Sequence, residues 1–246
     1  MGSIAAIAPA SSPPALRSYH LSQNSGAARR SCAQAAKYCI CAILVLSALR
    51  TFVGDASVVP TASMQNTVMV GDHLLWLKAL YGPQIPFSHW RLPRLRHVGR
   101  GQIIAFRYPP DPRQVYLKRA VAVGGDRVEI RDGVLWVNGN AVREPYVLYS
   151  TPPRNRGRFE QMASRNVPAG QIFVLGDNRD HSSDSREWGL VPEQNVLGSP
   201  LLVLWSYDAP PAQWLDWSLT HQVRFYCAAI PHLFAHTRWS RTFTLL

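Results

Sequence analysis

The chain has 246 residues, of which 47% are hydrophobic, so it can bury one sizeable core with at most a small second domain. Its 19 prolines and 16 glycines exclude long helices over most of the sequence. The formal net charge of +11 suits nucleic acid or an anionic membrane surface, but no zinc-ligand spacing or basic zipper helix accompanies it, so the composition favours a membrane over nucleic acid.

The N-terminal part divides into a polar tail and an apolar run. Residues 1–35 are rich in Ala, Ser and Pro, which predicts a disordered tail. Residues 36–53 are apolar and reach the lower length limit for a membrane-spanning helix, roughly 17 residues. A cleaved signal peptide or a buried helix of a soluble domain are the alternatives. An uncleaved anchor is favoured, because chemically distinctive residues follow within a short distance and no other strong helical pattern exists to pack against it.

Arg29 and Arg30 precede the apolar run. Positive charge on that side predicts a single-pass anchor with a cytoplasmic N-terminus and the body of the chain on the extracytoplasmic side.

Residues 54–210 have the pattern of short strands, which predicts a mainly β body. Apolar or alternating stretches indicate strands at 72–76, 102–107, 115–123, 171–175 and 201–205. Residues 127–142 predict a hairpin that turns at Asp132-Gly133. The segments 81–101 and 149–166 indicate long loops, and residues 211–246 form a C-terminal tail to which the pattern assigns no role.

Two segments carry a possible nucleophile and a possible base. Ser63 lies between small residues in PTASMQNTVMVGD, where its hydroxyl is either accessible for chemistry or simply part of a turn. Lys118 lies inside the apolar strand YLKRAVAV. Burial lowers the pKa of an ammonium, so a lysine in this position can accept a proton near neutral pH. Arg119 points to the other face and stays charged, which makes it a poor base.

The third segment, LGDNRDHSSDSREW at 175–188, concentrates acidic and hydroxyl residues in one loop. Its alternating acidic residues suggest a calcium loop, but the glycine and the closing glutamate of an EF-hand are missing. Its two arginines would also oppose a cation. The segment therefore predicts a rigid, hydrogen-bonded turn that is able to orient a catalytic lysine.

Together, the three segments resemble the sequence boxes of type I signal peptidases (leader peptidases), which are Ser–Lys serine endopeptidases. SMQNTVMVGD is similar to the serine box of that family, YLKRAVAVGGD to its lysine box and GDNRDHSSDSR to its C-terminal box. The boxes cover most of residues 36–205. Asn66 stands where the family usually has proline, and because Asn tolerates turn conformations, the turn is expected to form.

The resemblance implies antiparallel sheets that form a catalytic core with a small cap at roughly 129–167. It implies Ser63 as nucleophile, Lys118 as general base, and Thr61 with the Ser63 backbone N–H as the oxyanion hole. The implied supporting residues are Ser182, which hydrogen-bonds the lysine, the ion pair Asp184 and Arg186, and Asp177 and Asn178. The implied substrate-binding residues are Val59, Pro60, Met64, Val68, Leu74, Tyr116 and Leu117.

The resemblance also implies the biological setting. The substrates are preproteins bearing signal peptides, and neither a metal, a cofactor nor nucleic acid is required. A lone export peptidase with one N-terminal anchor indicates a bacterial inner (plasma) membrane in contact with lipid, and an organelle membrane is the alternative. The alternative from another class is a catalytically inactive, membrane-tethered β-domain that binds extended peptides. A self-cleaving repressor with the same dyad would need a DNA-binding module, which residues 1–55 do not supply.

Overall fold

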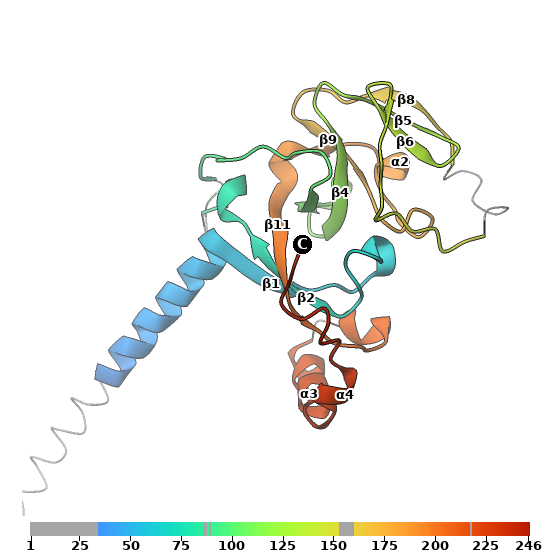
Figure 1. The fold of residues 1–246 in the computed structure, drawn as a ribbon. Coiled ribbons are helices and arrows are strands. Elements are labelled where there is room, and N and C mark those ends of the chain that lie inside the picture. The colour runs from blue at the N-terminus through green and yellow to red at the C-terminus, as the bar shows by residue number, and fades with distance from the viewer. Residues whose placement is uncertain (1–33, 86–87, 89, 153–159, 217) are drawn as a thin grey trace, which may run out of the picture. The chain divides into compact units, whose positions relative to one another are not determined.

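The structure is a computed structural model that describes residues 34–85, 88, 90–152, 160–216 and 218–246 (Figure 1). The predicted disordered tail at 1–35 lies almost wholly outside the described residues. The chain divides into two compact units, Met1–Leu49 and Arg50–Leu246.

One helix, Gln34–Phe52, is long and apolar enough to cross a membrane. It has 19 residues and a mean hydropathy of 1.6, and none of its apolar window is buried, unlike the core helix of a soluble protein. The same length and composition also fit an N-terminal signal sequence. The helix ends in a π-helical turn, Leu49–Val53 (η1), and strand β1 follows directly at Gly54.

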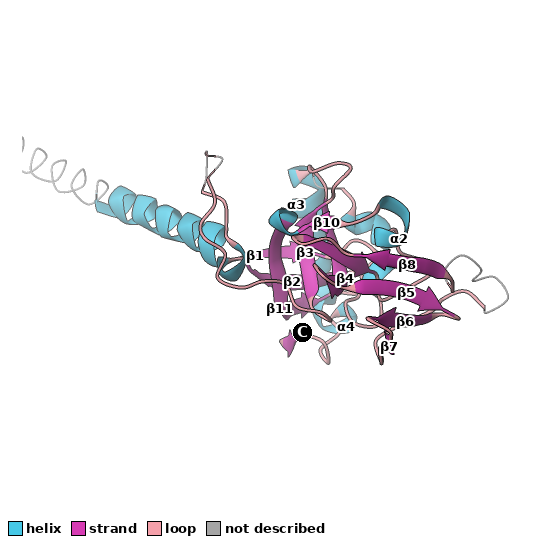
Figure 2. Cartoon of the chain, turned by 90° about the horizontal axis from the view of Figure 1, so that it is seen from above, coloured by secondary structure: helices cyan, strands magenta, loops and turns pink. Residues whose placement is uncertain are grey.

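The second unit is built from antiparallel strands, which confirms the predicted fold class. An eight-stranded sheet has the order β1-β2-β11-β3-β4-β9-β10 with β12 paired to β11, and a four-stranded sheet has the order β7-β6-β5-β8 (Figures 1 and 2). The strands are β1 Gly54–Val58, β2 Asp72–Leu77, β3 Ile103–Arg107, β4 Val115–Val123, β5 Arg127–Arg131, β6 Val134–Val137, β7 Asn140–Ala141, β8 Met162–Asn166, β9 Gln171–Leu175, β10 Val191–Pro192, β11 Val196–Ser206 and β12 Thr244–Leu245. The short helices are η2 Ala62–Met64, η3 Ala79–Tyr81, α2 Ser185–Trp188, η6 Glu193–Asn195, η7 Pro211–Trp214, α3 Leu219–Ala229, η8 Ile230–His232 and α4 Leu233–His236.

The predicted hairpin is confirmed by β5 and β6, which pair through Arg131 and Val134 at its turn. Asp132 and Gly133 both have positive φ, at 50° and 75°. Two positive φ angles at the centre of a two-residue loop match the twist of the flanking strands, and Asp-Gly adopts them readily.

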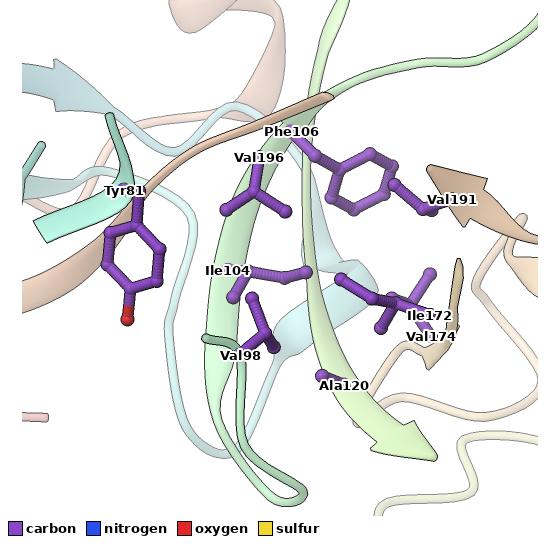
Figure 3. Close-up of a cluster of buried hydrophobic side chains, with 9 residues drawn as sticks. All are labelled: Tyr81, Val98, Ile104, Phe106, Ala120, Ile172, Val174, Val191 and Val196. Atoms are coloured by element: carbon purple, nitrogen blue, oxygen red, sulfur yellow. The ribbon is translucent and has the colours of Figure 1, made fainter. Parts of the chain in front are cut away.

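Strands β4 and β9 lie between two hydrophobic cores, so both of their faces are buried. Ala120, Ile172 and Val174 belong to the core in Figure 3, together with Ile104 and Phe106 from β3. On the other face, Val121, Ala122, Phe173 and Leu175 of the same two strands pack against the four-stranded sheet. Val121 and Ala122 both belong to this core because a bulge between Ala120 and Ala122 interrupts the alternation of β4. This double burial explains why 115–123 is apolar almost throughout instead of alternating.

The C-terminal segment, residues 211–246, packs against the sheet of the second unit, although the sequence pattern predicts no structure for it. Helices α3 and α4 are drawn together in Figure 1, and the buried Trp214 and Ala229 form a cluster with Tyr207 at the end of β11. His73 Nε2 lies 3.0 Å from the hydroxyl oxygen of Tyr226 on α3, which ties the helix to β2.

Replacing Ile104 by Ala should destabilise the second unit by roughly 2–5 kcal/mol, because the side chain is fully buried in the core of Figure 3 and its removal leaves a cavity. Leu201→Ala, at a position that is 43% exposed, is the control and should cost less than about 1 kcal/mol. Denaturant midpoints of the detergent-solubilised proteins measure both; equal losses would contradict this assignment of the core.

Candidate active site

Ser63 lies in a short turn that follows β1. The chain leaves β1 at Val58, passes through Thr61 in an extended conformation, and forms the 3₁₀ helix Ala62–Met64. The first N–H groups of such a helix have no partner within it, so the N–H of Ser63 is available to an incoming group. Thr61 Oγ1 lies 3.4 Å from Ser63 Oγ. The turn thus brings together the Ser63 hydroxyl, which is the candidate nucleophile, and two hydrogen-bond donors, the Ser63 N–H and the Thr61 hydroxyl.

The turn after this helix contains Asn66, at the position where the resemblance leads one to expect proline. Gln65 has φ −54° and ψ 144°, Asn66 has φ 90°, and the N–H of Thr67 donates to the carbonyl of Met64 over 3.1 Å. These angles describe a type II turn with Asn66 at its third position, where φ must be positive. Proline cannot adopt that angle, since its ring holds φ near −65°.

Lys118 reaches Ser63 from strand β4. Its Nζ donates a hydrogen bond of 2.7 Å to Ser63 Oγ, and the residue is only 4% exposed. Burial lowers the pKa of Lys118 from its ordinary value to about 8; the nearby charges of Asp184 and Asp177 oppose this shift, and that of Arg186 adds to it. The amine is therefore partly neutral near physiological pH and able to accept a proton.

The loop after β9 holds the turn of Ser63 in place. The N–H of Asn178 donates to the carbonyl of Ser63 over 3.1 Å, and its side-chain amide donates to the carbonyl of Ala62 over 3.2 Å. A Cβ on Gly176 would lie 2.6 Å from the Ser63 carbonyl oxygen and 2.1 Å from Ser182 Oγ. Glycine is therefore required at position 176 by the close approach of the two loops.

The predicted ion pair of the same loop is present. Arg186 Nη2 lies 2.8 Å from Asp184 Oδ2, and both side chains are almost fully buried. Asp184 also accepts a hydrogen bond from the N–H of Gly176 over 3.0 Å. The carboxylate thus fixes both ends of the loop and supplies negative charge near Lys118.

Ser182 does not make the contact that is predicted for it. Its Oγ is buried and has no hydrogen-bond partner within the described part of the chain, whereas it was expected to bond Lys118. In this structure, Ser63 takes the hydrogen bond of the lysine instead.

A buried ion pair between Arg119 and Asp177 joins the three segments. The guanidinium donates two bonds, of 2.8 and 2.6 Å, to the carboxylate, and Thr67 Oγ1 donates to the same carboxylate over 2.6 Å. The guanidinium also lies 3.7 Å from the ring centre of Tyr146. The sequence pattern identifies Arg119 only as a poor base, but its position beside Lys118 on an apolar strand is a signal that it, too, needs a buried partner.

The C-terminal segment contributes a residue that the sequence did not reveal. Arg241 donates a hydrogen bond of 2.9 Å to the carbonyl of Thr67 and one of 2.6 Å to the carboxylate of Asp72. Asp72 is fully buried. Asp72 in turn accepts from the N–H of Met69. The loop that follows Ser63 is therefore fixed by a residue far away in the sequence, which no local motif could indicate.

A cavity of about 640 Å³ opens beside Ser63 and Lys118. Five of the predicted substrate-binding residues line it, namely Val59, Pro60, Met64, Tyr116 and Leu117, and Thr61 lines it too. Val68 and Leu74 do not: both are fully buried in the core beneath the serine turn, so their prediction as pocket residues is wrong. Their side chains pack against Met64 and leave no surface for a substrate.

Within the described ranges, no group of three His, Cys, Asp or Glu side chains is placed to hold a metal ion.

Comparison with known proteins gives consistent matches. The model of the family described as "Signal peptidase, peptidase S26" matches residues 32–205. The chain is 32% identical to signal peptidase I of Pseudomonas aeruginosa over 200 residues, which cover 68% of this chain and 70% of that protein. It is also 32% identical to thylakoidal processing peptidase 1 of Arabidopsis thaliana over 195 residues, which cover 75% and 51% of the two chains. A crystal structure of signal peptidase I from Enterococcus faecalis aligns with 34% identity and a TM-score of 0.35, over 42% of this chain and 97% of that one.

Asn66→Gly should preserve the turn and most of the activity, whereas Asn66→Pro should destroy the turn, because proline cannot adopt φ near 90°. We expect Asn66→Pro to lose at least roughly 2 kcal/mol of stability and most of its peptidase activity. Denaturant unfolding and peptide cleavage measure the pair. A proline variant as stable and active as the glycine variant would show that the turn is not type II.

Proposed function

Because the chain belongs to the peptidase S26 family of signal peptidases, which are serine endopeptidases, we propose that it removes signal peptides from preproteins with a Ser63–Lys118 dyad. The observation that carries the proposal is the 2.7 Å contact between Ser63 Oγ and the buried Nζ of Lys118, at the wall of an open cavity. A serine hydroxyl is a weak nucleophile until a neighbouring base removes its proton.

The proposed reaction has two steps. Neutral Lys118 takes the proton of Ser63 as Oγ attacks the scissile carbonyl, and the resulting ammonium then protonates the leaving amine, which produces an acyl-enzyme. In the second step, Lys118 takes a proton from water, the hydroxide attacks the ester, and the proton returns to Ser63 Oγ. The histidine of a Ser-His-Asp triad performs the same transfers.

The oxyanion of each step needs donors that are already in place. The Ser63 N–H and the Thr61 hydroxyl are the proposed pair, since they lie in and immediately before the first turn of η2. The loss of one such donor costs roughly 3–4 kcal/mol of transition-state stabilisation in well-studied hydrolases. Asn178 acts indirectly, because its two bonds to the carbonyls of Ala62 and Ser63 orient the N–H groups of the turn.

The cavity supports binding of an extended peptide with small side chains. Apolar side chains from the end of β1 and from β4 line it. Strand β1 is at the edge of its sheet, and residues 115–118 of β4 precede the pairing of β4 with β9, so a substrate strand can pair beside either backbone. Shallow apolar pockets favour small residues, which is the A-x-A pattern found before signal-peptide cleavage sites.

The proposed location rests on the N-terminal helix Gln34–Phe52. As an uncleaved anchor with a cytoplasmic N-terminus, it would hold the catalytic unit against lipid on the extracytoplasmic side of a bacterial inner membrane, with no contact to nucleic acid. The rival proposal, an inactive peptide-binding domain, would not require Lys118 to be buried against Ser63.

Ser63→Ala and Lys118→Ala should each reduce preprotein cleavage by roughly 10³-fold or more, because each removes one partner of the proton transfer. Lys118→Arg should lose nearly as much, since arginine does not deprotonate. Cleavage by the detergent-solubilised full chain, with N-terminal sequencing of the product, measures this, and Ser240→Ala serves as the serine control. Activity that survives in Ser63→Ala would mean that the nucleophile is another residue.

The pH dependence of kcat/KM should report the Lys118 amine. Because the neutral amine is the base and its pKa is lowered to about 8, activity should rise with pH and level off above that value. Asp184→Asn should move this rise to lower pH, since the Asp184 carboxylate stabilises the ammonium and its removal also leaves the charge of Arg186 uncompensated. Asp132→Asn, in the β5–β6 turn, is the control. A profile that does not move in Asp184→Asn would exclude Lys118 as the titrating base.

A further inference from the structure

A second hollow adjoins the catalytic cavity and is lined by basic side chains. Its volume is about 550 Å³, and it shares Asp55, Lys78 and Leu197 with the catalytic cavity. Among the residues of its lining that the structure describes, four are cationic and only Asp55 is acidic. The cationic residues are Arg50, Lys78, Arg91 and Arg107. The hollow therefore carries an excess of positive charge.

One carboxylate serves two of these cations. Asp55 lies 2.9 Å from Arg50 Nε and 2.8 Å from Lys78 Nζ. The single negative charge of Asp55 is therefore shared by two cations and does not offset the charges of the other two arginines.

Arg91 and Arg107 have only neutral partners within the described part of the chain. Arg91 donates to the backbone carbonyls of Gly82 over 2.9 Å, of Val196 over 3.0 Å and of Gln194. Arg107 donates a hydrogen bond of 3.1 Å to the side-chain oxygen of Gln84. Burial, and then the charges of Arg107 and Arg94, lower the pKa of Arg91. Each guanidinium has five N–H groups, so both keep donors for a further acceptor. Two arginines that repel one another in a hollow are stabilised by an anion between them.

The position of the hollow in the chain indicates the source of that anion. Arg50 lies in the last turns of the apolar helix, which ends at Phe52, and β1 begins at Gly54 without a linker. At the end of a membrane-spanning helix, side chains meet phospholipid headgroups, and basic residues favour the anionic ones.

We propose that this hollow binds a phosphate group, supplied by the headgroup of an anionic phospholipid; the inference rests on the proposed role of Gln34–Phe52 as a membrane anchor. The guanidinium groups of Arg91 and Arg107 hold the phosphate oxygens, and Arg50 adds charge from the helix end. Because Ser63 follows Asp55 by eight residues, it lies at most about 28 Å along the chain from this residue of the hollow. The lipid thereby sets the height of the catalytic cavity above the membrane.

The test is native mass spectrometry of the delipidated full chain in neutral detergent, titrated with phosphatidylglycerol, with phosphatidylcholine and with inorganic phosphate. A Ser63→Ala background separates this inference from the proposed peptidase function, because binding is measured whether or not the chain cleaves. Arg107→Gln should weaken phosphatidylglycerol binding roughly fivefold, and Arg107→Lys should retain most of it. Arg113→Gln removes an exposed arginine that pairs with Asp111, and it is the charge-matched control with no expected effect.

Retention of phosphatidylglycerol over phosphatidylcholine that depends on Arg107 but not on Arg113 supports the proposal. Equal weakening in Arg107→Gln and Arg113→Gln would indicate diffuse charge and overturn it. If inorganic phosphate binds as tightly as the lipid and with the same dependence on Arg107, the source is free phosphate and the assignment to lipid is wrong. Displacement of the lipid by an acidic preprotein peptide would assign the hollow to the substrate instead.

Discussion

The contact between Ser63 and Lys118 sets the main constraint on this fold, because a lysine must lose most of its water to make it. A buried ammonium is costly unless it is paired or gives up its proton. The structure uses both effects, since burial lowers the pKa of Lys118 while Asp184 and Asp177 keep that shift moderate. A lysine with more acidic neighbours would stay charged and could not act as a base. A lysine with none would be neutral but would then need an acceptor for each N–H that the core leaves unpaired.

The two partners of this contact come from segments that do not touch along the chain, so further polar contacts must align them. Asn178 binds the serine turn directly, while Asp177 ties Thr67 to Arg119, the neighbour of Lys118. Buried ion pairs of this kind add little net stability, because desolvation offsets much of their attraction, but removing one partner is strongly destabilising. Their role here is geometric, because they hold β4 and the serine turn in one position relative to each other. Gly176 meets the same requirement by having no side chain where the two loops approach.

The sequence predicted the local features and missed the long-range ones, for physical reasons. The Asp132-Gly133 hairpin follows from local backbone preferences, and the two residues of the Ser63–Lys118 contact follow from motifs that concentrate unusual side chains. Leu74 is on β2, and the resemblance alone does not distinguish the strand face toward the pocket from the face toward the core. Val68 is in the loop before β2, and its burial in the same core depends on packing that the resemblance does not describe. Arg241 could not be predicted, because its partners Thr67 and Asp72 lie about 170 residues away. Whether Ser182 Oγ bonds Lys118, as predicted, or has no partner among the described residues depends on side-chain rotamers, which a motif does not determine.

The absence of a linker between the helix and β1 has a further consequence under the proposed anchoring. Ser63 follows Phe52 by eleven residues, so the nucleophile can lie at most about 40 Å from the end of the helix. A signal peptide carries its own apolar segment and would be held in the same membrane, so enzyme and cleavage site would meet within a thin layer. Confinement of this kind raises the effective concentration of the substrate without any new contact. Deep, tightly binding pockets are then unnecessary, and a cavity lined by apolar residues such as Val59 and Leu117 is sufficient to select small side chains while leaving the product free to depart.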